Sequence, residues 1–389
     1  MRILFVEYTS LVSGGQHSLL ELIRVLGREH EVVLACPRGE FEGLARRLGV
    51  SVVAIPESQI TFKLHPRHSL HALMRMLAAA WRLSRVIRSL RPGVVHANSV
   101  RAGLIGTLAV PRRVALVVHC RDALPAGRLG RAVRAVVLAR SDQVVAISRH
   151  VARIFAGPGW TARGVRVIDN AVDVNRFDPE QINQASSRVA VGVRDEPVLT
   201  VLAQLTPWKG QDLAIRVLAE LGDRLPSALL LLAGEAKFVS ETTRYDNRAF
   251  ERRLHELSNE LQLAGRVRFL GERLDPERVL AATDVLLVPS IEEPFGRTII
   301  EAMAMGVPVA ATCAGGPSEI LRDGIDGRLV DGRDPARWAS VVQELLGWPL
   351  DRRRAARAQA ATRFSPSRHA RVMTGVYEEA ITRAPRGRH

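Results

Sequence analysis

Short runs of β-branched and other apolar residues alternate with longer amphipathic runs along most of this chain. In the first half, the apolar runs occupy residues 2–8, 30–36, 50–56, 93–98, 114–120 and 143–148. Helical runs such as residues 16–27 and 68–90 lie between them. This alternation is typical of parallel sheets, because each parallel connection needs a crossover. The first half is therefore predicted to form an open, doubly wound α/β sheet.

The same alternation starts again after a polar stretch with a proline near each end, residues 178–197. The later apolar runs occupy residues 198–205, 228–234, 266–271, 284–290 and 308–312. We predict an N-terminal α/β domain over 1–180, a linker over 181–197, a second α/β domain over 198–365, and a C-terminal helix with a basic tail over 366–389. Two such domains would bind ligand at the carboxyl ends of their strands, in a cleft where they face each other.

The composition is that of a soluble globular protein, with 47% apolar and 24% charged residues among 389. No apolar run reaches the roughly 18–20 residues that a membrane span needs, and the N-terminus lacks the pattern of a signal peptide. The three cysteines, Cys36, Cys120 and Cys313, are odd in number and widely spaced. They predict neither disulfides nor a zinc site, so we expect a cytoplasmic protein.

The net charge of +15 is concentrated in the first half of the chain. Residues 1–180 hold 26 basic against 13 acidic residues, and only Lys63, Lys209 and Lys237 of the whole chain are lysines. The arginine bias is most simply a coding preference. No aromatic-rich basic stripe or zinc-finger spacing accompanies it, so nucleic acid is not a predicted partner.

Two glutamates, Glu293 and Glu301, flank a Pro-Phe-Gly break in the sequence IEEPFGRTIIEAMAM. The break follows an apolar strand and precedes a helical run, so it lies at the carboxyl end of the predicted second sheet. Gly296 lets backbone amides approach a ligand, and the free N–H groups of a helix start favour an anion. Amides and two carboxylates together suit a nucleotide-diphosphate sugar. Each glutamate alone is equally consistent with the preference of acidic residues for a helix N-terminus.

The spacing of these glutamates, followed by AMAMGVPV, resembles the signature of family 4 glycosyltransferases, which have the GT-B fold. The resemblance covers most of the chain and is strongest over residues 198–331. It implies two Rossmann-like domains facing across a cleft, and sugar transfer from a nucleotide-diphosphate donor with retention of configuration. It also implies that Glu293 contacts the donor sugar at the reacting end and that Glu301 holds the ribose hydroxyls. The other donor-binding residues that it suggests in this segment are Phe295, Gly296 and Arg297.

Further positions in the second half match the same family. Lys209 in LAQLTPWKGQ matches the phosphate-binding lysine, and a compact ammonium group suits a diphosphate oxygen. Gly234 and Glu235 in LLLAGEA match a turn near the nucleotide. The family usually has an arginine where this chain has Gln204, so Arg297 or Lys237 is expected to supply the missing positive charge.

In the first half, Gly14 and Gly15 lie between the first strand and a helix, without the spacing of a dinucleotide fingerprint. The resemblance implies that this turn approaches the donor phosphate and the acceptor. It also implies that His119, at the end of a strand, meets the transferred sugar through its side chain or main chain. We therefore assign Glu293, His119 and Lys209 to catalysis. Residues that also follow strands, with structural and functional roles both open, are Asn98, Arg121, Ser148 and Asn170.

The predicted function is retaining transfer of a sugar to an acceptor hydroxyl. The acceptor is either a lipid-linked or cell-envelope glycan, or a small natural product such as an antibiotic intermediate. No D-x-D sequence occurs, so we expect no metal and no other cofactor, with Lys209 and helix amides meeting the diphosphate charge. The alternatives are a sugar-nucleotide 2-epimerase of the same fold and a non-catalytic sugar-nucleotide-binding protein.

The helical run over residues 68–90 leaves the cellular location open. Arg75, Arg82 and Arg85 fall on one side of the helix. The apolar residues Leu70, Leu73, Leu77 and Ala80 fall on another side. This pattern is that of an ordinary crossover helix with a solvated face, which we prefer. It also fits a peripheral contact with an anionic membrane on the inner face. The oligomeric state is not predicted.

Overall fold

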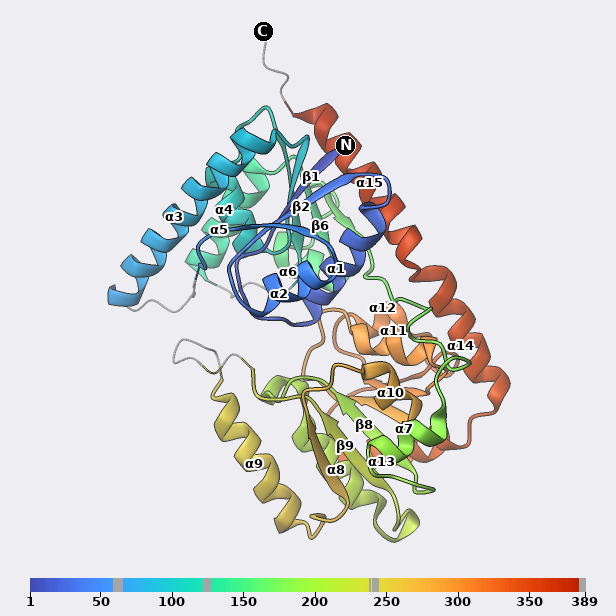
Figure 1. The fold of residues 1–389 in the computed structure, drawn as a ribbon. Coiled ribbons are helices and arrows are strands. Elements are labelled where there is room, and N and C mark those ends of the chain that lie inside the picture. The colour runs from blue at the N-terminus through green and yellow to red at the C-terminus, as the bar shows by residue number, and fades with distance from the viewer. Residues whose placement is uncertain (59–65, 122–126, 238, 240–244, 385–389) are drawn as a thin grey trace. The chain divides into compact units, whose positions relative to one another are not determined.

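The computed structural model describes residues 1–58, 66–121, 127–237, 239 and 245–384, with the side chains of 66–70 left out. The chain divides into two compact units (Figure 1). Unit 1 comprises Met1–Ala171 and Pro366–His389, and unit 2 comprises Val172–Ser365. Within the described residues, no helix is both long enough and apolar enough to cross a membrane.

Unit 1 is built on a parallel seven-stranded sheet with the strand order β3-β2-β1-β4-β5-β6-β7. Its strands are β1 (Arg2–Val6), β2 (Glu31–Cys36), β3 (Ser51–Ala54), β4 (Val94–Ala97), β5 (Ala115–Cys120), β6 (Gln143–Ala146) and β7 (Val165–Val167). Its helices are α1 (Gly14–Leu26), α2 (Glu40–Arg47), α3 (Pro66–Leu90), α4 (Val100–Ala109), α5 (Arg128–Arg140), α6 (Arg149–Ala156) and α15 (Pro366–Arg383). This is the predicted doubly wound topology.

Unit 2 repeats this order in a parallel six-stranded sheet, β10-β9-β8-β11-β12-β13. Its strands are β8 (Val198–Leu202), β9 (Leu229–Ala233), β10 (Val267–Gly271), β11 (Val285–Val288), β12 (Val309–Thr312) and β13 (Arg328–Val330). Its α-helices are α7 (Gln184–Ala190), α8 (Gln211–Leu221), α9 (Asn247–Glu260), α10 (Pro276–Ala281), α11 (Arg297–Ala304), α12 (Pro317–Ile320), α13 (Pro335–Leu346) and α14 (Leu350–Arg363). Two short 3₁₀ turns are η1 (Pro207–Lys209) and η2 (Gly222–Arg224).

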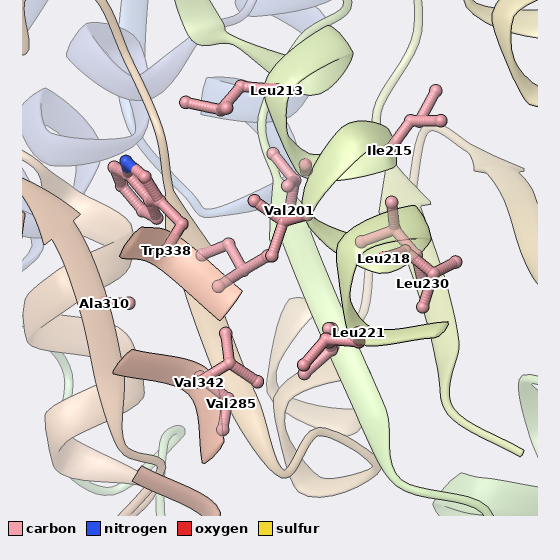
Figure 2. Packing of buried hydrophobic residues seen from close by; sticks show 14 of the residues in the cluster. Val201, Leu213, Ile215, Leu218, Leu221, Leu230, Val285, Ala310, Trp338 and Val342 are labelled. Atoms are coloured by element: carbon pink, nitrogen blue, oxygen red, sulfur yellow. The ribbon is translucent and has the colours of Figure 1, made fainter. Parts of the chain in front are cut away.

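The core of unit 2 joins the inner strands to α8 and α13. Figure 2 shows Val201, Leu218 and Trp338 within this cluster, all of them buried. The Trp338 indole N–H donates to the carbonyl oxygen of Gly332 at 3.1 Å, so the ring is buried without leaving its polar atom unpaired. Because parallel strands are covered by helices on both faces, their sequences are almost continuously apolar, as in LLLLA of β9.

The stretch predicted to be the linker, residues 181–197, belongs instead to unit 2, and the unit boundary falls after Ala171. The stretch contains α7, whose N-cap residue Asn183 accepts a hydrogen bond from the N–H of Ser186 at 2.8 Å. Val191 and Val193 are buried against Leu229 and Leu231. Its polar composition indicated a linker, but two buried valines pack the segment against the sheet.

The last helix, α15, packs on α1 and β5 and completes the core of unit 1. The segment 366–389 was predicted as a separate C-terminal helix and tail. In the structure the chain returns there to unit 1, and the segment is part of that unit. Met373, Val376 and Ala380 lie in one apolar cluster with Phe5 and Leu19. Apolar residues three and four positions apart give the helix a single buried face, and that face covers the sheet.

A buried polar seam accompanies this apolar contact. His96 Nδ1 lies 2.7 Å from the Tyr377 hydroxyl, and His369 Nδ1 lies 2.7 Å from the Asp169 carbonyl oxygen that it donates to. The rings of His96 and His119 meet edge to face, and His119 stacks on His369. The Nε2 atoms of all three histidines are buried and, within the described residues, have no hydrogen-bond partner. Neutral imidazoles tolerate this arrangement far better than imidazolium ions do.

Acidification is expected to weaken the folding of unit 1 through these histidines. Burial, with a smaller contribution from the Arg121 charge, lowers the pKa of His369 from 6.5 to about 4, against the hydrogen bond to Asp169. The unfolded chain therefore binds more protons, and the free energy of unfolding falls as pH drops below 6.5. From pH 7.5 to 5.5, His369 alone should contribute a loss of about 1.3 kcal/mol. Urea unfolding of the wild type and of His369→Asn at both pH values measures this difference.

His96 and His119, whose pKa values burial also lowers, add losses of the same sign in both proteins. Glu7 acts in the opposite direction, because burial raises the pKa of its carboxyl, and protonation relieves that cost as pH falls. These contributions are common to the wild type and the variant, so the comparison isolates His369. An identical pH dependence in the two proteins would contradict the assignment.

Candidate active site

The strand order of each sheet reverses once, between β1 and β4 in unit 1 and between β8 and β11 in unit 2. Open α/β sheets bind ligands outside the carboxyl ends of the strands at such a reversal. In unit 2 these ends lead into the Gln204–Lys209 segment and the loop before α11. In unit 1 they lead into Glu7 and Asn98. Each unit therefore presents its candidate residues at the topologically expected position.

The loops of unit 2 are held together by close backbone contacts. The N–H of Leu205 donates to the carbonyl oxygen of Glu235 at 2.9 Å, and the N–H of Ile291 donates to that of Trp208 at 2.8 Å. Gly234 has a φ of 150°, and a Cβ there would lie 2.1 Å from the Ala203 carbonyl oxygen. Gly234 and Glu235 are thus structurally joined to the segment that carries Lys209. Their contact with a nucleotide stays a prediction.

Glu293 and Lys209 form a largely buried ion pair. Lys209 Nζ lies 2.6 Å from Glu293 Oε2, and the same oxygen accepts a hydrogen bond from the Ser290 hydroxyl at 2.9 Å. The lysine ammonium also lies over the Trp208 ring, 4.2 Å from its centroid. Two residues that were assigned separately to the sugar and the diphosphate are therefore partners here. A donor that binds both residues would either break the ion pair or contact both side chains while they remain paired.

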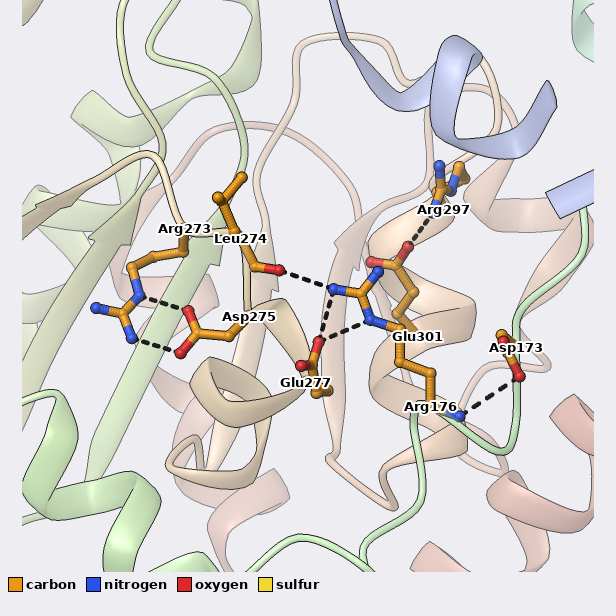
Figure 3. Close-up of polar contacts among 8 residues, drawn as sticks. All are labelled: Asp173, Arg176, Arg273, Leu274, Asp275, Glu277, Arg297 and Glu301. Carbon is orange, nitrogen blue, oxygen red and sulfur yellow. Dashed lines mark hydrogen bonds and ion pairs between the residues drawn. The ribbon is translucent and has the colours of Figure 1, made fainter. Parts of the chain in front are cut away.

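Glu301 pairs with Arg297 one turn earlier in α11, as Figure 3 shows. Arg297 Nη2 donates to Glu301 Oε1 at 2.6 Å, and both side chains are mostly buried. This order is unfavourable for the helix itself, because a cation at the N-terminus opposes the helix dipole. A helix optimised for stability alone would have the acidic residue first. Figure 3 also shows Arg176, which connects the start of unit 2 to α10 by donating to Glu277 and to the Leu274 carbonyl oxygen.

The Pro-Phe-Gly break has separate roles for its last two residues. The Phe295 side chain is 3% exposed and packs edge to face on Phe364, so a donor could meet only its main chain. Gly296 is the N-cap of α11 with a φ of 102°. This left-handed conformation turns the chain sharply into the helix and leaves the first N–H groups without intrahelical partners. These groups are the predicted anion site.

A second glycine turn, Gly315–Gly316, supports this loop from β12. The N–H of Gly316 donates to the carbonyl oxygen of Glu293 at 2.7 Å, and the N–H of Glu293 donates to Ala314 at 3.1 Å. A Cβ on Gly315 would lie 2.2 Å from the Glu293 carbonyl oxygen. The backbone of Glu293 is therefore fixed from both sides.

Gly316→Ala should displace the Glu293 loop and reduce glycosyl transfer. The added Cβ would lie 2.4 Å from Phe295 Cα, which is backbone and cannot move independently. Such overpacking costs about 1–3 kcal/mol of folding free energy. The check is kcat together with the urea midpoint. Gly347→Ala is the control, because its nearest atom is 3.5 Å away. Equal activity in the two variants would show that the turn does not position Glu293.

Gln204 stands where the family usually has an arginine, and two other residues could supply the missing positive charge. Lys237 pairs with Glu272, and Arg297 pairs with Glu301, so both cations have an acidic partner in unit 2. Of the two, Arg297 lies on α11 beside the predicted ribose-binding carboxylate and follows directly after Gly296. Arg297 is therefore the better placed replacement, and this assignment stays a prediction.

In unit 1, a buried hydrogen-bond network supports the start of α1, where Gly14 and Gly15 are the first two helical residues and not, as predicted, a turn before the helix. Glu7, fully buried at the end of β1, accepts hydrogen bonds from the side-chain amides of Asn98 at 2.8 Å and Gln16 at 3.0 Å. Asn98 also donates to the Gly15 carbonyl oxygen at 3.4 Å. Burial raises the pKa of the Glu7 carboxyl, and these hydrogen bonds oppose that rise. Sequence reasoning missed Glu7, although a charged residue at the end of an apolar strand was the signal.

Arg121 extends this network to the neighbouring strands. Its Nε donates to Asn98 Oδ1 at 2.6 Å, and its Nη1 donates to Asn170 Oδ1 at 2.9 Å and to the Ser18 hydroxyl at 3.1 Å. Three positions whose roles were open are thus brought together. The side chain of Ser148, the fourth such position, caps α6 by accepting from the Val151 N–H at 3.0 Å.

His119 lies beneath this network, where its side chain is completely buried. Its Nδ1 is 3.5 Å from Arg121 Nη2, and burial keeps its pKa well below the usual value. A side chain in this position can reach no ligand without rearrangement, so a role for His119 toward the sugar would fall to its main chain. That role stays a prediction.

Comparison with known proteins places this arrangement in a family. The family model described as Glycosyltransferase Family 4 matches residues 12–176, and the model described as Glycosyl transferases group 1 matches residues 183–363. A relative from Mycolicibacterium smegmatis is 30% identical over 370 residues, covering 90% of this chain and 89% of its own length. That relative is named GDP-mannose-dependent alpha-(1-6)-phosphatidylinositol monomannoside mannosyltransferase.

This chain belongs to glycosyltransferase family 4. A further relative of this glycosyltransferase, from Mycobacterium sp. (strain JLS), is named D-inositol 3-phosphate glycosyltransferase. It is 32% identical over 313 residues, which are 74% of this chain and 67% of the relative. Among solved structures, Anabaena Alr3699/HepE in complex with UDP and glucose has a TM-score of 0.83 and 25% identity, and covers 97% of this chain and 99% of its own. The glycosyltransferase therefore has the GT-B fold, as its sequence predicted.

Proposed function

We propose that this glycosyltransferase takes its sugar from a nucleotide-diphosphate donor and transfers it with retention of anomeric configuration. The observation that carries the proposal is the pairing of Glu293 with Lys209 and of Glu301 with Arg297 at the strand-order reversal of unit 2. This arrangement offers one carboxylate for the sugar, one for the ribose, and two cations for the diphosphate. The naming of a GDP-mannose-dependent relative and of a neighbour bound to UDP and glucose supports such a donor.

The chemistry follows from what these groups can stabilise. As the diphosphate leaves, negative charge develops on its oxygens and positive charge develops on the sugar ring. The Lys209 ammonium and the N–H groups after Gly296 would stabilise the leaving oxygens in a fixed geometry. The Glu293 carboxylate would then face the cationic ring. The acceptor oxygen bonds to the anomeric carbon as the bond from that carbon to the diphosphate breaks. The hydroxyl proton passes to the departing phosphate oxygen on the same face, so no strong base is needed.

We propose an acceptor that carries negative charge. The names of both relatives contain inositol together with a phosphate or a phosphatidyl group, and the basic excess of this chain lies in its first half. A lipid-linked or cell-envelope acceptor at the cytoplasmic face fits this charge better than a neutral natural product does.

Incubating the purified protein with UDP- and GDP-sugars, alone and with inositol phosphates or phosphatidylinositol, tests this function. Release of nucleoside diphosphate that requires the acceptor, together with an α-linked product from an α-linked donor, is the expected result. Formation of a C2-epimerised sugar without acceptor would show a sugar-nucleotide epimerase instead. Donor binding without any turnover would indicate a binding protein.

Transfer should persist in excess EDTA, because the proposed site meets the diphosphate charge with Lys209 and backbone N–H groups. Initial rates with 5-fold or so more chelator than any added metal would be compared with rates in Mg²⁺ and Mn²⁺. Loss of activity in chelator that either metal restores would contradict this charge assignment.

We also propose that α3 makes a peripheral contact with anionic membranes. Ala79, Ala80 and Leu83 form its buried face, so Ala80 belongs to the core and not to the apolar side first expected. A second apolar strip is exposed, consisting of Leu73, Met74, Leu77 and Trp81. Leu73→Ser/Leu77→Ser should reduce sedimentation with anionic vesicles at low salt. Equal sedimentation of the wild type with neutral and anionic vesicles would discard the proposal.

A further inference from the structure

Unit 1 contains a cavity of about 590 Å³ at the carboxyl ends of β3, an edge strand of its sheet, and the neighbouring strand β2. Arg38 follows β2, and Ile55 and Glu57 follow β3. The third side of the cavity is α3, which contributes Arg75, Trp81 and Arg82. Arg75 Nε donates to the Glu57 carbonyl oxygen at 2.9 Å, which fixes the helix to the strand end. The volume is in the range of small-ligand pockets.

The cavity has an excess of positive charge that the protein does not neutralise. Three guanidinium groups line it against the single carboxylate of Glu57. Glu57 Oε1 already accepts hydrogen bonds from the N–H and the hydroxyl of Ser10, at 3.1 and 2.9 Å. Within the described part of the chain, Arg38 and Arg82 have no hydrogen-bond or ion-pair partner. Guanidinium groups that line one cavity without partners match the oxygens of a phosphate.

The remaining walls are apolar. Ile55 and Pro56 line one side, and Trp81, 58% exposed, lines the other. The guanidinium group of Arg85 stacks on the Trp81 ring at 5.0 Å and helps to fix its orientation. An indole face beside charged groups suits a ring whose faces are apolar and whose edge carries hydroxyls, such as a sugar or a cyclic polyol. A bare inorganic anion would leave this surface unused.

Hydrogen bonds join the cavity to the segment that leads from β1 into α1 and its first residues, Gly14 and Gly15. Ser10, which donates to the Glu57 carboxylate, lies in the segment between β1 and α1, the helix that begins with Gly14 and Gly15. The carbonyl oxygen of Ser10 also accepts from the N–H of Phe41, at the start of α2. A ligand that orders the wall of the cavity would therefore order the segment leading to Gly14.

We infer that this cavity binds the phosphate group of the acceptor, a phosphorylated polyol or sugar, with Arg38 and Arg82 as its principal ligands. Arg75 orients the wall and adds a third positive charge, and Trp81 contacts the ring. This inference rests on the proposed function, since it assigns a binding site to the acceptor of that reaction. The phosphate is carried either by a soluble ester or by the headgroup of a phospholipid.

Calorimetric titration of the wild type with D-inositol 3-phosphate and with unphosphorylated inositol tests the inference. The phosphate ester should bind more tightly than inositol, and its affinity should fall with added salt. Arg38→Gln and Arg82→Gln should each weaken ester binding by about tenfold, and the double variant by about 100-fold. Arg82→Lys should recover part of the loss because it restores the charge. Arg88→Gln is the matched control, because Arg88 is exposed on the same helix and does not line the cavity.

A second arm uses phosphatidylcholine vesicles with and without phosphatidylinositol. Binding that depends on Arg38 and Arg82 but appears only with these vesicles identifies the phosphate as a lipid headgroup. Arginine-dependent binding of the soluble ester identifies a soluble acceptor. If the double variant binds both probes as the wild type does, or if Arg88→Gln weakens binding equally, the cavity is not the phosphate site. Wild-type donor cleavage, measured separately, reports on the proposed function itself.

Discussion

Lys209→Met is expected to lower kcat/KM for sugar transfer by about 10²–10³-fold, because it removes a fixed positive charge from the leaving diphosphate. Glu293 is 6% exposed, and the same change leaves its carboxylate with the Ser290 hydroxyl as its one polar side-chain partner among the described residues. Removing one member of a buried ion pair costs about 3–5 kcal/mol of folding free energy. Urea unfolding and steady-state kinetics on the same preparation measure both effects.

The double variant Lys209→Met/Glu293→Gln separates the two roles of the pair. Methionine and glutamine keep the approximate volumes without either charge, so the folding free energy should return toward the wild-type value. Activity should not return, because the diphosphate would still lack its cation. If the double variant recovered both stability and transfer, the pair would be only structural. If the single variant kept its kcat/KM, Lys209 would have no role toward the donor.

Glu301→Ala is expected to raise the donor KM by about 30- to 150-fold with a smaller decrease in kcat. A carboxylate that accepts from ribose hydroxyls contributes about 2–3 kcal/mol, and it does so in the ground state and the transition state alike. A donor that lacks the ribose 2′ and 3′ hydroxyls should bind the wild type as weakly as the normal donor binds the variant. The variant itself should not distinguish the two donors.

Glu344→Ala is the control for this prediction. Glu344 also pairs with an arginine of unit 2, Arg328, but lies on α13. Its removal should leave the donor KM unchanged. An unchanged KM in Glu301→Ala, or a further loss when the variant meets the deoxygenated donor, would remove Glu301 from the ribose.

The inner strands of both sheets were predictable from sequence, because buried parallel strands are short continuous apolar runs. The two strands that were missed, β7 and β13, are three-residue edge strands with the sequences VRV and RLV. An arginine in so short a run leaves no periodic signal. The destination of α15 was also hidden, because an apolar helix face does not specify which sheet it will cover.

The candidate site was predictable to a different degree in the two units. In unit 2, the residues that match the family motifs lie on loops that backbone hydrogen bonds join to one another. It could not show that Lys209 pairs with Glu293, since 84 residues separate them and the contact exists only in the folded chain. In unit 1 the polar residues after each strand were noted singly. Glu7, which accepts a hydrogen bond from Asn98, ends an apolar run and was read only as part of a strand.

The return of α15 to unit 1 has a consequence for the order in which the protein can be made. Unit 2 is a continuous segment, whereas unit 1 needs residues from both ends of the chain. During synthesis, unit 2 leaves the ribosome whole while the first sheet still lacks the helix that covers β5. Unit 1 is thus started first and completed last. Until α15 is synthesised, the apolar face that this helix covers stays exposed on the nascent chain.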